Sequence, residues 1–233
     1  MREIVLDTET TGMDPAEGDR LVEIGCVEVL NYVPTGRTYH VYINPERDVP
    51  AGAVAVHGLT AEFLKDKPVF SQIYTDFLDF VAEGNLVIHN AAFDMKFINA
   101  ELKKVGHKPI PDKRVVDTLT MARQKFPGSP ASLDALCRRF NVDNSGRELH
   151  GALLDAQLLS EVYLEMMGGR QHGLALQGAP VANNDQSQAQ VSSQAARQRT
   201  YREPRRFVAS EEEQAAHTQM LEGITDPLWL NRS

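Results

Sequence analysis

The sequence has no long hydrophobic run, and this absence argues against one class of protein. No stretch of about 18 consecutive apolar residues occurs in the chain, so no membrane-spanning helix is expected. The opening residues, MREIVLDTE, reach acids too early to form the apolar core of a signal peptide. Cysteine is also scarce. The two cysteines, Cys26 and Cys137, have neither the spacing of a zinc site nor that of a disulfide framework. We therefore expect two buried, reduced thiols in a cytoplasmic protein.

An excess of basic charge is the second feature that is missing. The net charge is −8, which does not indicate a protein that binds nucleic acid through charge alone. Basic and acidic residues balance from residue 170 onward, so residues 1–169 carry the whole negative excess. An acidic domain can still act on a polyanion when some of its acids hold metal ions.

Aromatic residues and leucine are missing from residues 177–200, where Gln and Ser dominate. Such a segment cannot bury enough apolar surface to order itself. We therefore predict an ordered domain over residues 1–169, a flexible linker over 170–200 and a tail over 201–233.

The tail carries signals of order. Ser210 followed by Glu213 is a capping-box pattern at the start of a short helix over residues 211–223. The only tryptophan, Trp229, follows this helix among apolar neighbours.

The first 169 residues alternate between strand and helix patterns. Three early strands with short connections indicate an antiparallel meander, with a turn at residues 33–36. Later strand–helix units add parallel strands, so the expected fold class is α/β, a mixed sheet flanked by helices. The predicted strands are 3–9, 21–30, 37–43, 85–89 and 114–117, and the predicted helices are 72–82, 93–105, 133–140 and 152–167.

Two acids at the end of the first strand raise a question of charge. Asp7 and Glu9 lie two residues apart in VLDTETTG, so both carboxylates project from one face of the strand. Like charges this close destabilise the fold unless a cation lies between them. The residues alone leave open whether that cation is Lys, Arg or a metal ion.

Other chemistry-bearing residues follow later strands and helices. Asp94 lies just after the strand NLVIH, and His150 precedes Asp155 by five residues at the start of the last strong helix. Asp155 lies among leucines, and its residue pattern leaves open a plain ion pair with Lys or Arg on a narrow polar side of the helix. Asp117, between a strand and a helix, is predicted to be an N-cap and not a ligand.

The arrangement of these residues resembles the DEDDh branch of the DEDD 3′→5′ exonucleases. Asp7-Thr8-Glu9-Thr10-Thr11-Gly12 is similar to the first motif of that family, His89-Asn90-Ala91-Ala92-Phe93-Asp94 to the second, and His150-Gly151-Ala152-Leu153-Leu154-Asp155 to the third. The resemblance covers residues 1–169 and implies a ribonuclease H-like fold.

The resemblance also implies roles for individual residues. Asp7, Glu9 and Asp155 would hold one Mg²⁺ or Mn²⁺ ion and contact the substrate, and Asp94 would help Asp7 to hold a second ion about 4 Å away. His150 would be the general base, since its ordinary pKa of about 6.5 suits proton transfer near neutral pH. Thr10 and His57 would contact the terminal nucleotide.

Beyond the domain, the chain is similar in plan to the proofreading exonucleases of bacterial DNA polymerase III. That plan implies a substrate with a single-stranded or frayed DNA 3′ end, a tail that docks on the polymerase (alpha) subunit through anchors such as Trp229, and room for a small theta-like subunit. Gln171, Leu174 and Leu176 resemble a sliding-clamp-binding peptide, although a plain linker has nearly equal weight.

Two rival functions remain open from the sequence. One is an exoribonuclease that trims RNA 3′ ends. The other is a replisome scaffold with a secondary nuclease role.

Overall fold

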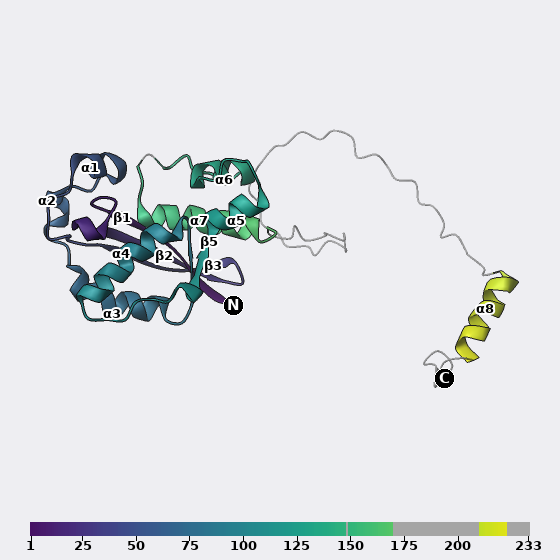
Figure 1. Cartoon of the computed structure of the whole chain (residues 1–233). Coiled ribbons are helices and arrows are strands. Elements are labelled where there is room, and N and C mark those ends of the chain that lie inside the picture. Colours follow the sequence, from purple (N-terminus) through teal and green to yellow (C-terminus); the bar gives the residue numbers. More distant parts are fainter. Residues whose placement is uncertain (148, 170–209, 223–233) are drawn as a thin grey trace, which may run out of the picture. The chain divides into compact units, whose positions relative to one another are not determined.

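The computed structural model describes residues 1–147, 149–169 and 210–222 (Figure 1). The chain divides into two compact units, with a boundary after Leu176, and each unit is described by itself. The anchors Gln171, Leu174, Leu176 and Trp229 lie outside the described residues, as does the predicted linker.

The first unit contains five strands and seven α-helices within its described residues. The strands are β1 (Arg2–Thr10), β2 (Leu21–Leu30), β3 (Val33–Tyr42), β4 (Asn85–Ile88) and β5 (Val115–Asp117). The helices are α1 (Ala51–His57), α2 (Ala61–Leu64), α3 (Phe70–Val81), α4 (Ala91–Lys104), α5 (Thr118–Lys125), α6 (Leu133–Phe140) and α7 (Ala152–Met166), with short 3-10 turns at η1 (Pro15–Glu17) and η2 (Asp112–Arg114).

The strands form one mixed sheet in the order β3-β2-β1-β4-β5. β1 pairs antiparallel with β2 and parallel with β4, while β2 pairs antiparallel with β3 and β4 parallel with β5. The predicted antiparallel meander followed by parallel strand–helix units is therefore confirmed. The central strand, β1, is the one that carries the first pair of acids.

Alternation along β1 divides the core into two layers. Its even-numbered residues Ile4 and Leu6 face α3 and α4, where Phe77 and Phe97 are fully buried. Its odd-numbered residues, with Val5 among them, face α6 and α7. Both faces of the sheet are covered, so a polar side chain on β1 is buried unless it lies near the strand end.

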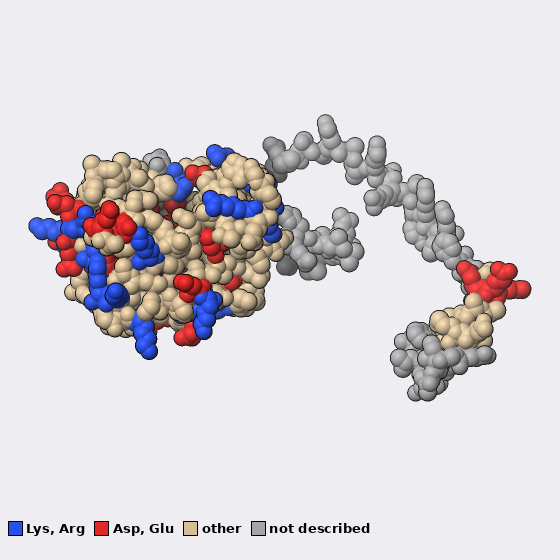
Figure 2. Space-filling model, viewed as in Figure 1, with Lys and Arg blue, Asp and Glu red and all other residues tan. Residues whose placement is uncertain are grey.

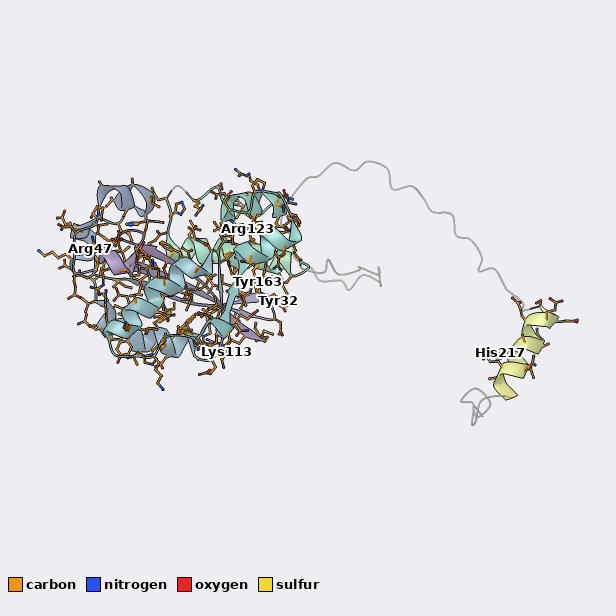
Figure 3. All side chains as sticks on the ribbon, in the orientation of Figure 1. Tyr32, Arg47, Lys113, Arg123, Tyr163 and His217 are labelled. Carbon is orange, nitrogen blue, oxygen red and sulfur yellow. The ribbon has the colours of Figure 1, made fainter. Side chains whose placement is uncertain are left out.

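One contact fixes α7 on its side of the sheet. The Tyr163 hydroxyl donates to Glu3 Oε1 at 3.1 Å, and both side chains are buried. Tyr32 packs edge-on against Tyr163, with ring centroids 5.6 Å apart (Figure 3). The first strand and the last helix of the unit are thus joined directly.

The turn predicted at residues 33–36 is wrong. The β2–β3 hairpin turns at Asn31 and Tyr32, which have φ angles of 50° and 69°, as a two-residue turn of the favoured hand requires. Gly36, with φ 87°, lies instead in a bulge of β3 opposite Glu28, where the register shifts. The prediction took Gly36 as the sign of a chain reversal, whereas this glycine marks an irregularity within the edge strand β3.

The second unit has one described helix, α8 (Glu211–Glu222). Glu213 N donates to Ser210 Oγ at 3.2 Å, and Ser210 N donates to Glu213 Oε2 at 2.8 Å, which confirms the predicted capping box. Met220 is 54% exposed.

On the first unit, charged side chains of both signs are interspersed over the face seen in Figure 2. Among the described helices, none is long and apolar enough to cross a membrane.

Candidate active site

The carboxyl end of β1 places two acids on the side of the sheet that α7 covers. Asp7 and Glu9 continue the odd-numbered row that begins with Glu3 and Val5, and Glu9 is only 9% exposed. Asp7 is partly exposed. The sheet therefore ends in two neighbouring carboxylates, as the sequence predicts.

Asp94 reaches the same place from α4. The helix starts immediately after β4 because Asn90 adopts a left-handed conformation with φ 64°, which turns the chain sharply. Thr8 Oγ1, on the α4 side of β1, donates to Asp94 Oδ1 at 2.7 Å. This hydrogen bond holds a carboxylate that is only 3% exposed.

Asp155 is brought to β1 by a glycine on the neighbouring strand. Gly25 of β2 pairs with Asp7, and a Cβ atom on Gly25 would lie only 2.2 Å from the backbone nitrogen of Leu153. The absence of that atom lets the first turn of α7 press against the sheet. Asp155, in this turn, is 3% exposed and lies beside the β1 acids.

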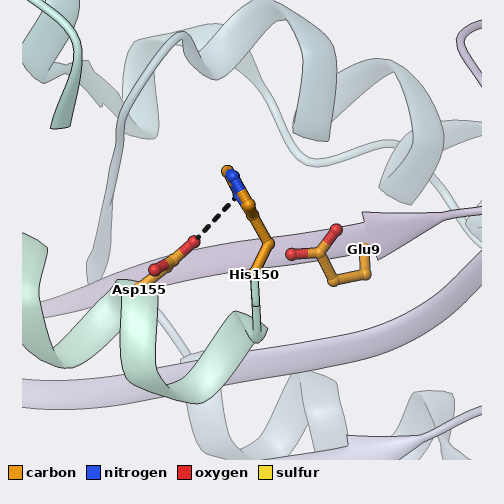
Figure 4. A group of neighbouring side chains, drawn as sticks. All are labelled: Glu9, His150 and Asp155. Atoms are coloured by element: carbon orange, nitrogen blue, oxygen red, sulfur yellow. Dashed lines mark ion pairs between the residues drawn. The ribbon is translucent and has the colours of Figure 1, made fainter. Parts of the chain in front are cut away.

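His150 closes the group from the segment before α7. Its backbone nitrogen donates to Val56 O at 3.0 Å, which ties this segment to α1. Its Nδ1 lies 3.5 Å from Asp155 Oδ2, while about half of the side chain stays exposed. Glu9, His150 and Asp155 each offer one atom to a common point, and these atoms lie within 4.8 Å of one another (Figure 4).

All five residues that the three motifs predict as catalytic line one cavity of about 680 Å³. Met13, His89, Phe93 and Arg123 also line its walls. Such a cavity has room for a nucleotide-sized molecule.

The electrostatics of the site call for added positive charge. Burial, together with the neighbouring acids, raises the pKa of Asp7 well above its ordinary value and that of Glu9 to about 8. Burial also raises the pKa of Asp94 to about 7, against the opposing hydrogen bond from Thr8. Oxygen-rich, mutually repelling carboxylates of this kind fit hard divalent cations, which would favour their charged forms.

Arg147 is a member of the site that the sequence analysis did not single out. Its Nε donates to Asp155 Oδ1 at 2.5 Å and its Nη2 to Asp155 Oδ2 at 2.7 Å, while its Nη1 donates to Asp134 Oδ1 at 2.7 Å. The available signal was a lone basic residue three positions before His150 in RELHGALLD. The Arg partner of Asp155 and the convergence of the acids predicted as metal ligands are both present, so the ion pair does not exclude the metal-ligand hypothesis for Asp155.

The two predicted nucleotide contacts lie near this cavity but not in its wall. His57 is 5% exposed, and its Nδ1 accepts from Leu59 N at 3.0 Å. Burial lowers the pKa of His57, and positive charge on His150 acts in the same direction. Thr10 Oγ1 donates to Gly12 O at 2.6 Å, so its hydroxyl hydrogen is already used.

Asp117 is an N-cap, as predicted. Its Oδ1 accepts from Leu119 N at 3.0 Å at the start of α5 and from Asn90 N at 3.1 Å. It therefore supports the α4 turn that carries Asp94.

Comparisons with known proteins agree with this geometry. A family model described as Exonuclease matches residues 4–163. A Rickettsia felis protein named DNA polymerase III subunit epsilon is 55% identical over 196 residues, covering 83% of this chain and 86% of that one. A Salmonella typhimurium protein of the same name is 47% identical over 230 residues, covering 95% and 92%.

A solved structure, the nuclease domain of 3′hExo described as a DEDDh family member bound to rAMP, has a similar fold. It superposes with a TM-score of 0.61 at 18% identity, over 71% of this chain and 91% of that chain.

The mixed sheet, the acidic cavity and the family match together define an exonuclease of ribonuclease H-like fold. The chain belongs to the family of DNA polymerase III epsilon subunits. The class expected from the motifs, a 3′→5′ exonuclease that depends on divalent metal ions, is thereby confirmed.

Proposed function

We propose that this chain removes mispaired nucleotides from DNA 3′ ends as the proofreading subunit of DNA polymerase III, with its active site at the end of β1. The observation that carries the residue assignment is the convergence of Asp7, Glu9, Asp94, His150 and Asp155 on one cavity. The replication role is supported by the relatives named DNA polymerase III subunit epsilon, which match over most of their length.

The carboxylates of Asp7, Glu9, Asp94 and Asp155 would hold two divalent ions, of which Mg²⁺ and Mn²⁺ are the candidates. When bound, such ions stabilise the charge that develops on the attacking and leaving oxygens at phosphorus. The four acids come from β1, α4 and α7, so their positions depend on packing across the sheet.

His150 would take the proton from the attacking water. In this structure Arg147 donates to Nδ1 at 2.9 Å. In the catalytic form Nδ1 would instead carry the ring hydrogen, with Asp155 Oδ2, 3.5 Å away, as its partner, and the lone pair of Nε2 would be free to accept that proton. The exposure of about half of the ring lets water reach it. His57 and Thr10 would border the terminal nucleotide.

Selection for mispairs would follow from fraying. An unpaired 3′ end reaches a single-stranded site at a lower unstacking cost than a paired end does. The site itself then needs no means of reading the base sequence.

The tail would bind the replication machinery. Residues 201–233, with Trp229, would dock on the polymerase (alpha) subunit, Gln171, Leu174 and Leu176 would contact the sliding clamp, and a theta-like subunit would bind the nuclease unit. Tethering of this kind raises the local concentration of nuclease at the primer end. The protein would then act in the cytoplasm, at the replisome.

The test is degradation of a 3′-mismatched primer by the full chain and by Asp7→Ala, with and without EDTA. We expect hydrolysis to release nucleoside monophosphates, to stop with EDTA and to be lost in Asp7→Ala, which should keep its fold. Asp79→Ala, an exposed acid on α3, is the matched control and should remain active. Normal activity of Asp7→Ala would refute the ligand assignment.

Matched DNA and RNA oligomers with free 3′ ends separate the leading proposal from its rival. Faster hydrolysis of DNA supports proofreading. Preference for RNA would instead indicate an exoribonuclease.

A further inference from the structure

Arg147 is a basic residue in the wall of a cavity that is otherwise rich in acids. Its side chain is only 10% exposed and lies among the acids proposed as metal ligands. Its charge lowers the pKa values of Asp7 and Glu9, against the stronger effect of burial. A buried cation that faces a cluster of acids and pairs with one of them stabilises that cluster when metal is absent.

The guanidinium uses the whole inner edge of one carboxylate. Nε and Nη2 of Arg147 donate to the two different oxygens of Asp155, at 2.5 and 2.7 Å. This two-point geometry is the strongest that an arginine and a carboxylate form. A dication on Asp155 would repel the adjacent guanidinium with twice the strength of a monovalent charge.

The same guanidinium also sets the state of the histidine. Nη2 of Arg147 lies 2.9 Å from His150 Nδ1, and because arginine only donates, Nδ1 must accept. A neutral His150 in this arrangement carries its proton on Nε2 and cannot accept another there. Arg147 therefore competes with a metal ion for Asp155, and it holds His150 in the tautomer that cannot act as a base through Nε2.

A third contact shows where the guanidinium can remain when it leaves Asp155. Nη1 of Arg147 already donates to Asp134 Oδ1 at 2.7 Å, and the Asp134 side chain is 47% exposed in the first turn of α6. Asp134 can therefore keep the charge of Arg147 at the cavity edge while Asp155 is released.

We propose that Arg147 is an internal counter-ion that occupies Asp155 in the metal-free protein and must be displaced toward Asp134 before divalent ions bind and His150 is freed. The inference rests on the proposed assignment of Asp155 as a metal ligand. It makes Arg147 a positioning residue that sets the metal concentration at which the site becomes competent.

The test is Mn²⁺ binding to the full chain without nucleic acid, measured by calorimetry or by the electron paramagnetic resonance of free Mn²⁺. Arg147→Gln should bind Mn²⁺ about tenfold more tightly than the unaltered chain, because the metal no longer displaces a cation. Asp134→Asn should bind it several-fold more weakly, since the displaced guanidinium loses its second partner. Combined with Arg147→Gln, Asp134→Asn should have little further effect.

Arg138→Gln is the matched control, because it removes the same charge from an exposed position on α6 and should leave the affinity within about twofold. Arg147→Lys keeps the charge but not the two-point contact, so it should tighten binding by an intermediate factor, and it keeps the test decisive if the glutamine variant does not fold. Structural damage would weaken metal binding and cannot produce this pattern.

Equal or weaker Mn²⁺ binding by both Arg147 variants would overturn the inference while leaving the metal ligands in place. If the unaltered chain binds no Mn²⁺, the ligand assignment itself fails and the inference fails with it. A Mn²⁺ affinity that Asp7→Asn leaves unchanged would locate the fault in the proposed function and not in Arg147.

Discussion

At the scale of single residues, the candidate active site combines buried acids, whose charged forms are unfavourable, with a histidine that is open to water. Three acids have raised pKa values, largely because they are buried, while His150 keeps about half of its surface in water. The division matches two roles, since metal ligands gain from burial and a general base needs access to water.

His150→Ala tests the role of the base. We expect the rate of hydrolysis to fall by about 10²–10⁴-fold, because a positioned base contributes roughly that much. Mn²⁺ binding to the variant, measured by calorimetry, should be retained. A rate for the unaltered chain that stays constant across pH 6–9 would remove His150 from this role.

Glu9 makes the stability of the metal-free protein depend on pH. Its folded pKa of about 8 lies above the ordinary value of 4.5, so between these values the folded chain holds a proton that the unfolded chain has released. The stabilisation is complete below pH 4.5 and is lost as pH rises through 8. In EDTA, the melting temperature should therefore fall from pH 5 to pH 8.

Glu9→Gln is the control for this titration, because its amide carries no charge at any pH. Calorimetric melting of the variant should show a shallower fall over the same range. An identical slope in both proteins would assign the pH dependence to other groups.

At the scale of elements, the close approach of α7 to the sheet decides where Asp155 lies. Gly25→Ala would place a methyl group 2.2 Å from Leu153 N and force the helix away from β1. Overpacking of this size costs about 3 kcal/mol, which should lower the melting temperature by roughly 6–12 °C and reduce hydrolysis by moving Asp155.

The matched control is Gly52→Ala on α1, where no atom lies within 4 Å of an added Cβ. That change should leave the melting temperature equal or slightly higher, since alanine favours helix. If both alanine variants melt alike in a thermal scan, the close approach at Gly25 does not position α7.

The sequence predicted the elements whose apolar period is strong and missed those whose signal is weak. β1, β4, α4, α6 and α7 were found because alternating or helical patterns bury one face. α1 and α2 were not predicted, because they are short and largely exposed, and α5 was indicated only by the predicted N-cap at Asp117. Element type follows from local pattern, whereas short helices depend on tertiary packing.

The candidate site shows the same division. Motif order identified the five residues that meet in the cavity, because each motif is a contiguous string of residues. Arg147 and Gly25 were not found, since their importance comes from what lies opposite them in space. A lone arginine or glycine gives no such information along the chain.

At the scale of the whole molecule, the nuclease unit and the tail are proposed to act separately. A chain cut after residue 169 should keep full exonuclease activity on a primer, because all the cavity residues lie before that point. It should fail to co-purify with the polymerase subunit in a pull-down, whereas the full chain succeeds. Retention of the shortened chain would contradict the docking role of residues 201–233.

The buried contact between Glu3 and Tyr163 has a consequence for biosynthesis. It joins the third residue to a residue near the end of the unit, and Asp7 and Asp155 are separated by almost as much chain. During synthesis on the ribosome β1 emerges long before α7, so with the proposed ligands the nascent chain would be unable to cut nucleic acid until nearly the whole unit has left the exit tunnel.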